Sequence, residues 1–185
     1  MELRELSKKK IEDIYNSYMQ QDFPADEMKP FAVIDRLYDN GCYFGYGLYE
    51  EDILRAYALF VKSPEGSVKV LDYLAVVSDK RGSGYGGKCL AFIKELLNQD
   101  AGIILEVEDP GKTENPKEIE IRERRIRFYT NNNVIMSKVK ATAAGVDYRI
   151  MYMPCSRMLS DEEIMEELDK VYCTIFGKGR HTLSC

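Results

Sequence analysis

The sequence contains a single histidine, His181. A Ser–His–Asp type of triad needs a histidine packed among its partners, and zinc sites usually take several cysteine or histidine ligands. We therefore expect neither a histidine-based triad nor a metal site. We also expect His181 to lie in a loose tail, because chain ends are seldom held in place.

Export and membrane signals are missing as well. No apolar run approaches the roughly 18 residues needed to span a bilayer, and the opening MELRELSKKK has no apolar core of the signal-peptide kind. The five cysteines are scattered and form no C-x-x-C pair, which is typical of reduced thiols. We expect a cytoplasmic protein that contacts no membrane.

A strong charge of one sign is also absent. The net charge is −5 over 185 residues, which argues against nucleic acid as a partner because nucleic-acid-binding proteins carry basic surfaces. The length and a hydrophobic fraction of 45% fit one globular domain with a real core. We expect that domain to cover residues 1–177, and the loose tail to cover 178–185.

The most informative stretch is LDYLAVVSDKRGSGYGGKCLAFIKELL, residues 71–97. An apolar strand is followed by a basic turn, a glycine-rich loop and a helix with one apolar side. Each glycine inside a helix costs about 1 kcal/mol against alanine, so these glycines indicate backbone that takes φ > 0 or passes close to another group. Such a loop at a helix N-terminus presents unpaired N–H groups to an anion, typically a phosphate.

Two binding functions fit this loop, and a tight turn without a ligand is a third interpretation. Gly82, Gly84 and Gly87 match the dinucleotide fingerprint G-x-G-x-x-G, and Glu106 stands where a ribose-binding acid belongs. The other pattern is R-x-x-G-x-G, which begins at Arg81. Two features favour it. A polar turn separates the strand from the first glycine, and about seventy residues of helices and antiparallel strands precede the loop, unlike in a dinucleotide fold.

The rest of the chain predicts a mixed α/β fold. A first strand and two helices precede three strands between residues 42 and 77, whose short loops predict an antiparallel meander. The glycine-loop helix then crosses to a strand at 102–107, as in a parallel crossover. Two further helices flank two more strands: Asn115 caps the first helix, and Ser160 and Glu163 form a capping box for the second.

The order of elements and two motifs together resemble the GNAT N-acetyltransferase family over most of the chain. RGSGYG, residues 81–86, matches the family signature Q/R-x-x-G-x-G/A after a strand ending LAVV, and the run RIRFY, which ends at Tyr129, is similar to the second family pattern. The resemblance implies a GNAT fold. This is a mixed, mostly antiparallel sheet of about seven strands, splayed at the cofactor site, with helices on both faces.

The resemblance also implies how the cosubstrate acetyl-CoA is held. Its pantetheine arm pairs with the backbone of a strand at Leu74, Ala75 and Val76. Its pyrophosphate lies on the N–H groups of a seven-residue loop. The loop residues are Arg81, Gly82, Ser83, Gly84, Tyr85, Gly86 and Gly87. Arg122 stands where many members have an asparagine that contacts the cofactor arm, so this chain lacks that contact residue.

Catalysis in this family is direct attack of an amine on the thioester, without a covalent enzyme intermediate. The reaction needs a base for the amine proton and an acid for the leaving thiolate. Tyr129 matches the general acid of the family. The candidates for the base are carboxylates on the two splayed strands: Glu106 first, because it lies further inside its strand, then Glu108 and Asp72.

The acceptor amine, a small molecule or a peptide, is not identified by the sequence. The resemblance places its site near the first two helices, roughly Tyr18 to Tyr38, and the region of Cys155. Asp22, Asp26 and Glu27 would suit a cationic amine there. Two other functions stay open, a non-catalytic acyl-CoA binding module and a dinucleotide-binding protein. Dimers are common in the family, so a homodimer is a further expectation.

Overall fold

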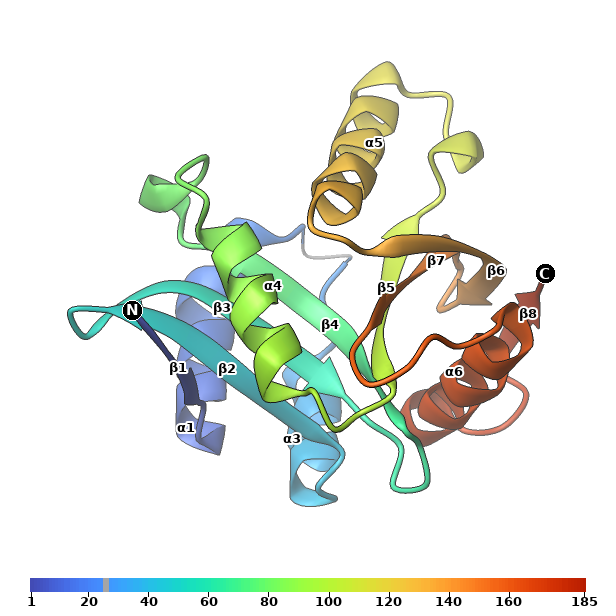
Figure 1. Ribbon diagram of the computed structural model, residues 1–185, viewed down its shortest axis with the longest axis horizontal. Helices are drawn as coiled ribbons and strands as arrows, with labels where there is room; N and C mark the ends of the chain where they lie inside the picture. The colour runs from blue at the N-terminus through green and yellow to red at the C-terminus, as the bar shows by residue number, and fades with distance from the viewer. Residues whose placement is uncertain (25–26) are drawn as a thin grey trace. The chain divides into compact units, whose positions relative to one another are not determined.

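The computed structural model describes residues 1–24 and 27–185. They form two compact units, Met1–Pro64 with Leu71–Ile93 and Glu65–Val70 with Lys94–Cys185. Each unit combines strands and helices (Figure 1). No helix in the described part of the chain is both long and apolar enough to cross a membrane.

The first unit is built on strands that follow the order of the chain. β1 (Glu2–Glu5), β2 (Tyr43–Glu50), β3 (Ile53–Val61) and β4 (Val68–Val76, in this unit from Leu71 on) are neighbours in that order. The β1–β2 and β2–β3 pairs are antiparallel. All side chains of β3 from Ala56 to Val61 are fully buried, so this strand is covered on both faces.

Helices lie on both sides of these strands, α1 and α3 on one side and α4 on the other (Figure 1). Each turns an apolar stripe inward, and the buried residues are Ile11 and Ile14, Ile34 and Leu37, and Cys89, Leu90 and Ile93. The bounds are α1 (Lys8–Ile14), the π-helical turn η1 (Tyr15–Met19), α2 (Gln20–Asp22), α3 (Phe31–Asp39), the 3₁₀ turn η2 (Ser78–Lys80) and α4 (Tyr85–Leu96).

The second unit has four strands in a different order. β5 (Gly102–Glu108), β7 (Val146–Pro154), β6 (Ile135–Ala143) and β8 (His181–Ser184) are neighbours in that order, and every pair is antiparallel. The helices are η3 (Pro110–Lys112), α5 (Pro116–Asn131) and α6 (Asp161–Phe176). Asn115 caps α5, and Ser160 with Glu163 forms the capping box of α6, both as predicted.

The mixed α/β class with mostly antiparallel strands is confirmed, but the described residues form eight strands rather than about seven. The additional strand is β8, which the sequence predicted as a loose tail. Its residues pair with β6, from Ala143 opposite His181 to Lys140 opposite Ser184. The physical reason is packing against α6, because the His181 side chain is only 4% exposed.

Candidate active site

The loop that leads into α4 depends on glycine for its backbone shape. Gly82 and Gly84 have φ of +78° and +80°, a left-handed conformation that glycine takes without strain. A Cβ atom at either position would meet no atom within 4 Å. The glycines are therefore required by backbone conformation and not by crowding, and space remains open beside them.

The loop also carries a set of unengaged backbone donors. The N–H groups of Arg81 and Ser83 turn back to the carbonyls of Ser78 and Lys80. Within the described residues, five N–H groups around them donate to no protein acceptor. These belong to Gly82, Gly84, Tyr85, Gly86 and Gly87. Three of them are in the first turn of α4, where a helix offers no acceptor, and at the positive end of its dipole. This arrangement suits a phosphate.

The Arg81 side chain is held by a buried carboxylate. Its Nη2 donates to Asp22 Oδ1 over 2.6 Å, and its Nε lies 3.5 Å from the carbonyl oxygen of Val76. The Asp22 side chain is 3% exposed, and its other oxygen accepts from the Tyr57 hydroxyl over 2.7 Å. The sequence analysis suggested Asp22 as a contact for a cationic acceptor amine. In the structure its carboxylate instead anchors the loop to α2. Asp26, offered with it, lies outside the described residues.

The start of α4 is fixed to β2. The Tyr85 hydroxyl donates to Glu50 Oε2 over 2.6 Å, and Arg55 Nε lies 3.4 Å from the same oxygen. The hydrogen bond from Tyr85 is the main cause that lowers the pKa of Glu50. On β4, the residues predicted to meet the pantetheine arm, Leu74, Ala75 and Val76, are all half-buried.

Asp72, a candidate for the base, is paired with a cation. Its side chain is 3% exposed and forms an ion pair with Lys29 Nζ. The Tyr43 hydroxyl donates to its other oxygen over 2.9 Å, and Lys29 Nζ also lies 5.5 Å from the centre of the Tyr73 ring. Sequence reasoning missed Lys29 because its loop shows no periodic pattern that would place it.

In the second unit, Glu106 and Glu108 lie on β5, and their intervening neighbour Val107 is buried. The Tyr172 hydroxyl of α6 donates a hydrogen bond to Glu106 Oε1. Burial, and then the charge of Glu106, raises the pKa of Tyr172. This hydroxyl is therefore a donor that keeps its proton. No sequence signal linked α6 to Glu106.

Glu108 is paired with Arg122 of α5, whose Nε is 3.3 Å from Glu108 Oε2. Arg122 also donates to the carbonyl oxygen of Asp109 over 2.9 Å, and its side chain is 15% exposed. The arginine that replaces the usual asparagine of the family pattern therefore ties α5 to the end of β5.

Tyr129 lies in the last turn of α5 and is 9% exposed. Burial raises the pKa of its hydroxyl to about 12, although Arg125 lowers it. Within the described residues this hydroxyl forms no hydrogen bond. It is thus a protonated donor at neutral pH whose hydrogen-bonding capacity is not used by the surrounding protein.

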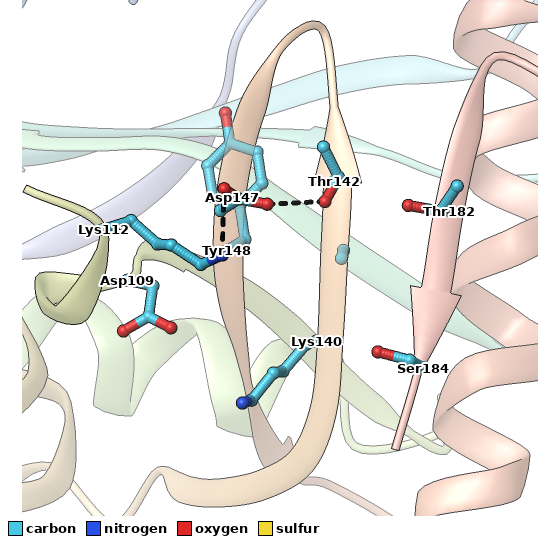
Figure 2. Close-up of a pocket in the computed structure, with 9 residues that line it drawn as sticks. Asp109, Lys112, Lys140, Thr142, Asp147, Tyr148, Thr182 and Ser184 are labelled. Atoms are coloured by element: carbon cyan, nitrogen blue, oxygen red, sulfur yellow. Dashed lines mark hydrogen bonds and ion pairs between the residues drawn. The ribbon is translucent and has the colours of Figure 1, made fainter.

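A polar cavity of about 200 Å³ lies in the same unit, between η3 and the strands β6, β7 and β8 (Figure 2). Asp147 on its wall accepts from the Thr142 hydroxyl over 2.6 Å and lies 3.6 Å from Lys112 Nζ. The cavity is lined by none of the residues that the sequence assigned to catalysis or to the cofactor.

Comparison with known proteins gives one family. A family model described as the acetyltransferase (GNAT) family matches residues 9–115. The Bacillus subtilis (strain 168) protein YjbC, which carries the name of an acetyltransferase, is 28% identical over 152 residues, 81% of this chain and 74% of that protein.

Solved structures give the same fold. A GNAT-family structure from Bacteroides thetaiotaomicron matches with a TM-score of 0.75 at 19% identity, over 96% of this chain and 99% of that chain. An aminoglycoside 6′-N-acetyltransferase complexed with coenzyme A matches with a TM-score of 0.64 at 15% identity, over 86% of this chain and 100% of that chain. At such identities these matches show the fold alone.

Proposed function

Because the chain belongs to the GNAT acetyltransferase family, we propose that it transfers the acetyl group of acetyl-CoA to a primary amine that attacks the thioester directly. The family makes it an acetyl-CoA-dependent N-acetyltransferase. The dinucleotide interpretation of the glycine loop is therefore wrong, and the non-catalytic binding module is set aside. The polar turn that ends at Arg81 was the sequence signal against the fingerprint, because the strand does not run directly into the first glycine.

One observation carries the cofactor part of the proposal. The five unengaged N–H groups from Gly82 to Gly87 are gathered at the start of α4, and a pyrophosphate is the group of CoA that such donors bind. In our proposal the residues from Arg81 to Gly87 hold the pyrophosphate, and the backbone at Leu74, Ala75 and Val76 receives the pantetheine arm. Arg81 helps to shape the loop, since its N–H donates to the Ser78 carbonyl and Asp22 holds its side chain.

Tyr129 is the proposed acid. When the amine displaces CoA, the C–S bond breaks and its electron pair goes to sulfur, which then takes a proton. The Tyr129 hydroxyl keeps its proton at neutral pH, because its pKa is raised to about 12, and no described residue competes for it. The cost of giving up that proton falls if a nearby cation stabilises the phenolate, and Arg125 acts in this direction.

Glu106 is the proposed base. Asp72 and Glu108 each hold a cation, Lys29 and Arg122, and taking a proton would forfeit those ion pairs. Glu106 accepts from the hydroxyl of Tyr172. Its carboxylate can take a proton from the ammonium group of the acceptor, directly or through water, and this leaves the neutral amine that attacks the thioester.

The acceptor is proposed only as a class, a primary amine of a small molecule or a peptide. The aminoglycoside 6′-N-acetyltransferase described above acts on one such amine, as its name states. We also propose a cytoplasmic location. It is supported by the five free cysteines, which suit a reducing compartment.

The test is release of free CoA thiol from acetyl-CoA with a panel of polyamines, aminoglycosides, amino acids and peptides with free N-termini. We expect at least one class to raise thiol release above hydrolysis in buffer, with the acetylated amine detected by mass spectrometry. If CoA binds but no primary amine in the panel is acetylated, the proposed acceptor class is wrong.

A further inference from the structure

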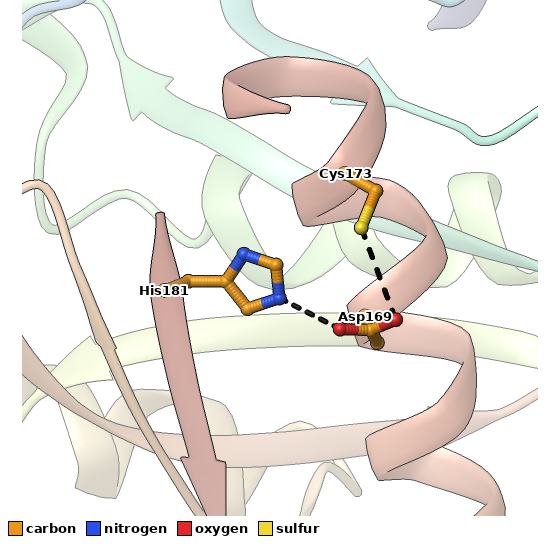
Figure 3. Close-up of side chains that lie close together, drawn as sticks. All are labelled: Asp169, Cys173 and His181. Carbon is orange, nitrogen blue, oxygen red and sulfur yellow. Dashed lines mark hydrogen bonds and ion pairs between the residues drawn. The ribbon is translucent and has the colours of Figure 1, made fainter. Parts of the chain in front are cut away.

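A cluster of three side chains lies outside the residues assigned to acetyl transfer (Figure 3). Asp169 and Cys173 are four residues apart on α6 and so share one side of the helix, and His181 faces them from β8. Their potential ligand atoms all lie within 4.8 Å of one another. Carboxylate oxygen, thiol sulfur and imidazole nitrogen are the three donor types that bind zinc in proteins.

The histidine of this cluster is already oriented. Its Nε2 is 2.7 Å from Asp169 Oδ1, and the Cys173 sulfur is 3.9 Å from Asp169 Oδ2. The Tyr172 ring packs on the imidazole with centroids 4.9 Å apart, and the side chain is 4% exposed. The imidazole is therefore held with Nε2 toward the carboxylate of Asp169.

The other ring nitrogen, His181 Nδ1, is buried and has no hydrogen-bond partner among the described residues. A neutral imidazole has one N–H and one lone pair. With the proton on Nδ1, the lone pair of Nε2 is directed toward Asp169 and can be given to an ion.

We propose that Asp169, Cys173 and His181 bind a divalent transition-metal ion, with zinc as the best match. A tetrahedral zinc ion with ordinary bond lengths holds such donors about 3.4–3.6 Å apart. The present separations of 2.7 and 3.9 Å lie on either side of this range, and Asp169, 57% exposed, has room to adjust. Thiolate and imidazole disfavour magnesium and calcium, which take oxygen ligands.

Binding is balanced by loss of one proton, since the thiolate and not the thiol is the ligand. The Cys173 proton goes to solvent, water fills the fourth position, and the ion links α6 to β8. The sequence argued against a metal site because it placed His181 in a loose tail. The pairing of β8 with β6 is what brings His181 to the two residues on α6.

The test uses the full chain, freed of metal by a chelator and titrated with Co²⁺. We expect a cobalt–thiolate charge-transfer absorption that saturates at one ion per chain and disappears when Zn²⁺ is added. Cys173→Ser should remove this absorption. It should also weaken binding by at least about 10–100-fold, since loss of an outer partner alone costs that much. Cys155→Ser and Cys185→Ser are the matched controls and should keep both properties.

Thermal unfolding supplies a second readout. An ion that binds the folded chain raises the unfolding temperature, so Zn²⁺ should raise it in the parent and in Cys155→Ser, but not in Cys173→Ser or Asp169→Asn. Unfolding without metal checks that each variant folds. Absence of the thiolate band in the parent, or its persistence in Cys173→Ser, would overturn the proposal.

Discussion

A single hydroxyl carries the acid step of the proposed mechanism. Tyr129→Phe keeps the buried ring and its contact with Phe128 but removes the proton. Loss of a general acid costs about 10²–10⁴ in rate, so we expect kcat to fall by that factor. The binding of CoA should change little. The measurement is steady-state kinetics with an accepted amine beside calorimetry with CoA, and turnover near that of the parent would exclude the role.

The base step is tested by a matched pair of carboxylates on one strand. Glu106→Gln preserves shape and can still accept from Tyr172, but it cannot take a proton. Because the ionised form is the active one, activity of the parent should fall as pH drops through the pKa of the base. We expect this acidic limb to vanish in Glu106→Gln and to remain in Glu108→Gln. The reverse pattern in the pH–rate profiles would move the role to Glu108.

For these residues, the sequence predicts positions along a strand but not the contacts with other elements. The sequence placed Glu106 and Glu108 on one strand, and they flank the buried Val107 there, because alternation along a strand is a local property. Their partners, Tyr172 and Arg122, come from two different helices. Such contacts depend on how elements pack, and no local pattern encodes them.

At the scale of elements, the glycine loop gives a controlled test of cofactor binding. Gly84→Asp adds a carboxylate at the proposed pyrophosphate site and strains a residue with φ of +80°. Gly145→Asp, in the turn between β6 and β7, creates the same strain at φ of +82°, also with open space beside it. We expect similar losses of stability, but loss of CoA binding only in Gly84→Asp. Equal affinities by calorimetry would contradict the assigned phosphate site.

The strand β8 gives a second test at this scale. Deleting residues 178–185 removes the ladder with β6 and the packing of His181 on Tyr172. We expect the free energy of unfolding to fall by about 1–3 kcal/mol, the worth of one buried side chain with its hydrogen bonds. Urea unfolding in the presence of a chelator measures this apart from any metal. Deletion of Cys185 alone, outside the strand, is the control and should have no effect.

Element ends and the antiparallel pairing of β2 with β3 were predicted, but the pairing of the last strand was not. The caps at Asn115 and Ser160 are as expected, because a cap is settled by a few adjacent residues. The strand β8 was missed. The four residues HTLS carry no strand signal by themselves, and they form a strand only because they pair with β6, which is distant in the sequence.

For the whole molecule, buried tyrosines set an alkaline limit on stability. Burial is the main cause that raises the pKa of six of them. These are Tyr43, Tyr57, Tyr73, Tyr129, Tyr152 and Tyr172. Above about pH 10 the unfolded chain loses these protons while the folded chain keeps them, so the folded state binds more protons and stability falls as pH rises.

The expected slope is about 1.4 kcal/mol per pH unit for each tyrosine that titrates only on unfolding. Urea unfolding in steps from about pH 8 to pH 11 should show a flat region and then a steep fall. Tyrosinate absorbance should rise together with unfolding and not before it. Early ionisation of most tyrosines in a chain that is still folded would contradict this prediction.

The outermost strands have a consequence for self-association. The first and last strands in the order of sheet neighbours are β1, in the first unit, and β8, in the second. Each is only four residues long, ELRE in β1 and HTLS in β8. An unpaired strand edge is a template for another chain, and short, polar or charged edge strands are among the devices that prevent such pairing. Loss of β8 would uncover residues 140–143 of β6, the part that it pairs with, and would open this edge to strand addition by a second molecule. A chain cut before His181 should therefore aggregate under conditions in which the intact chain stays dispersed, as light scattering would show.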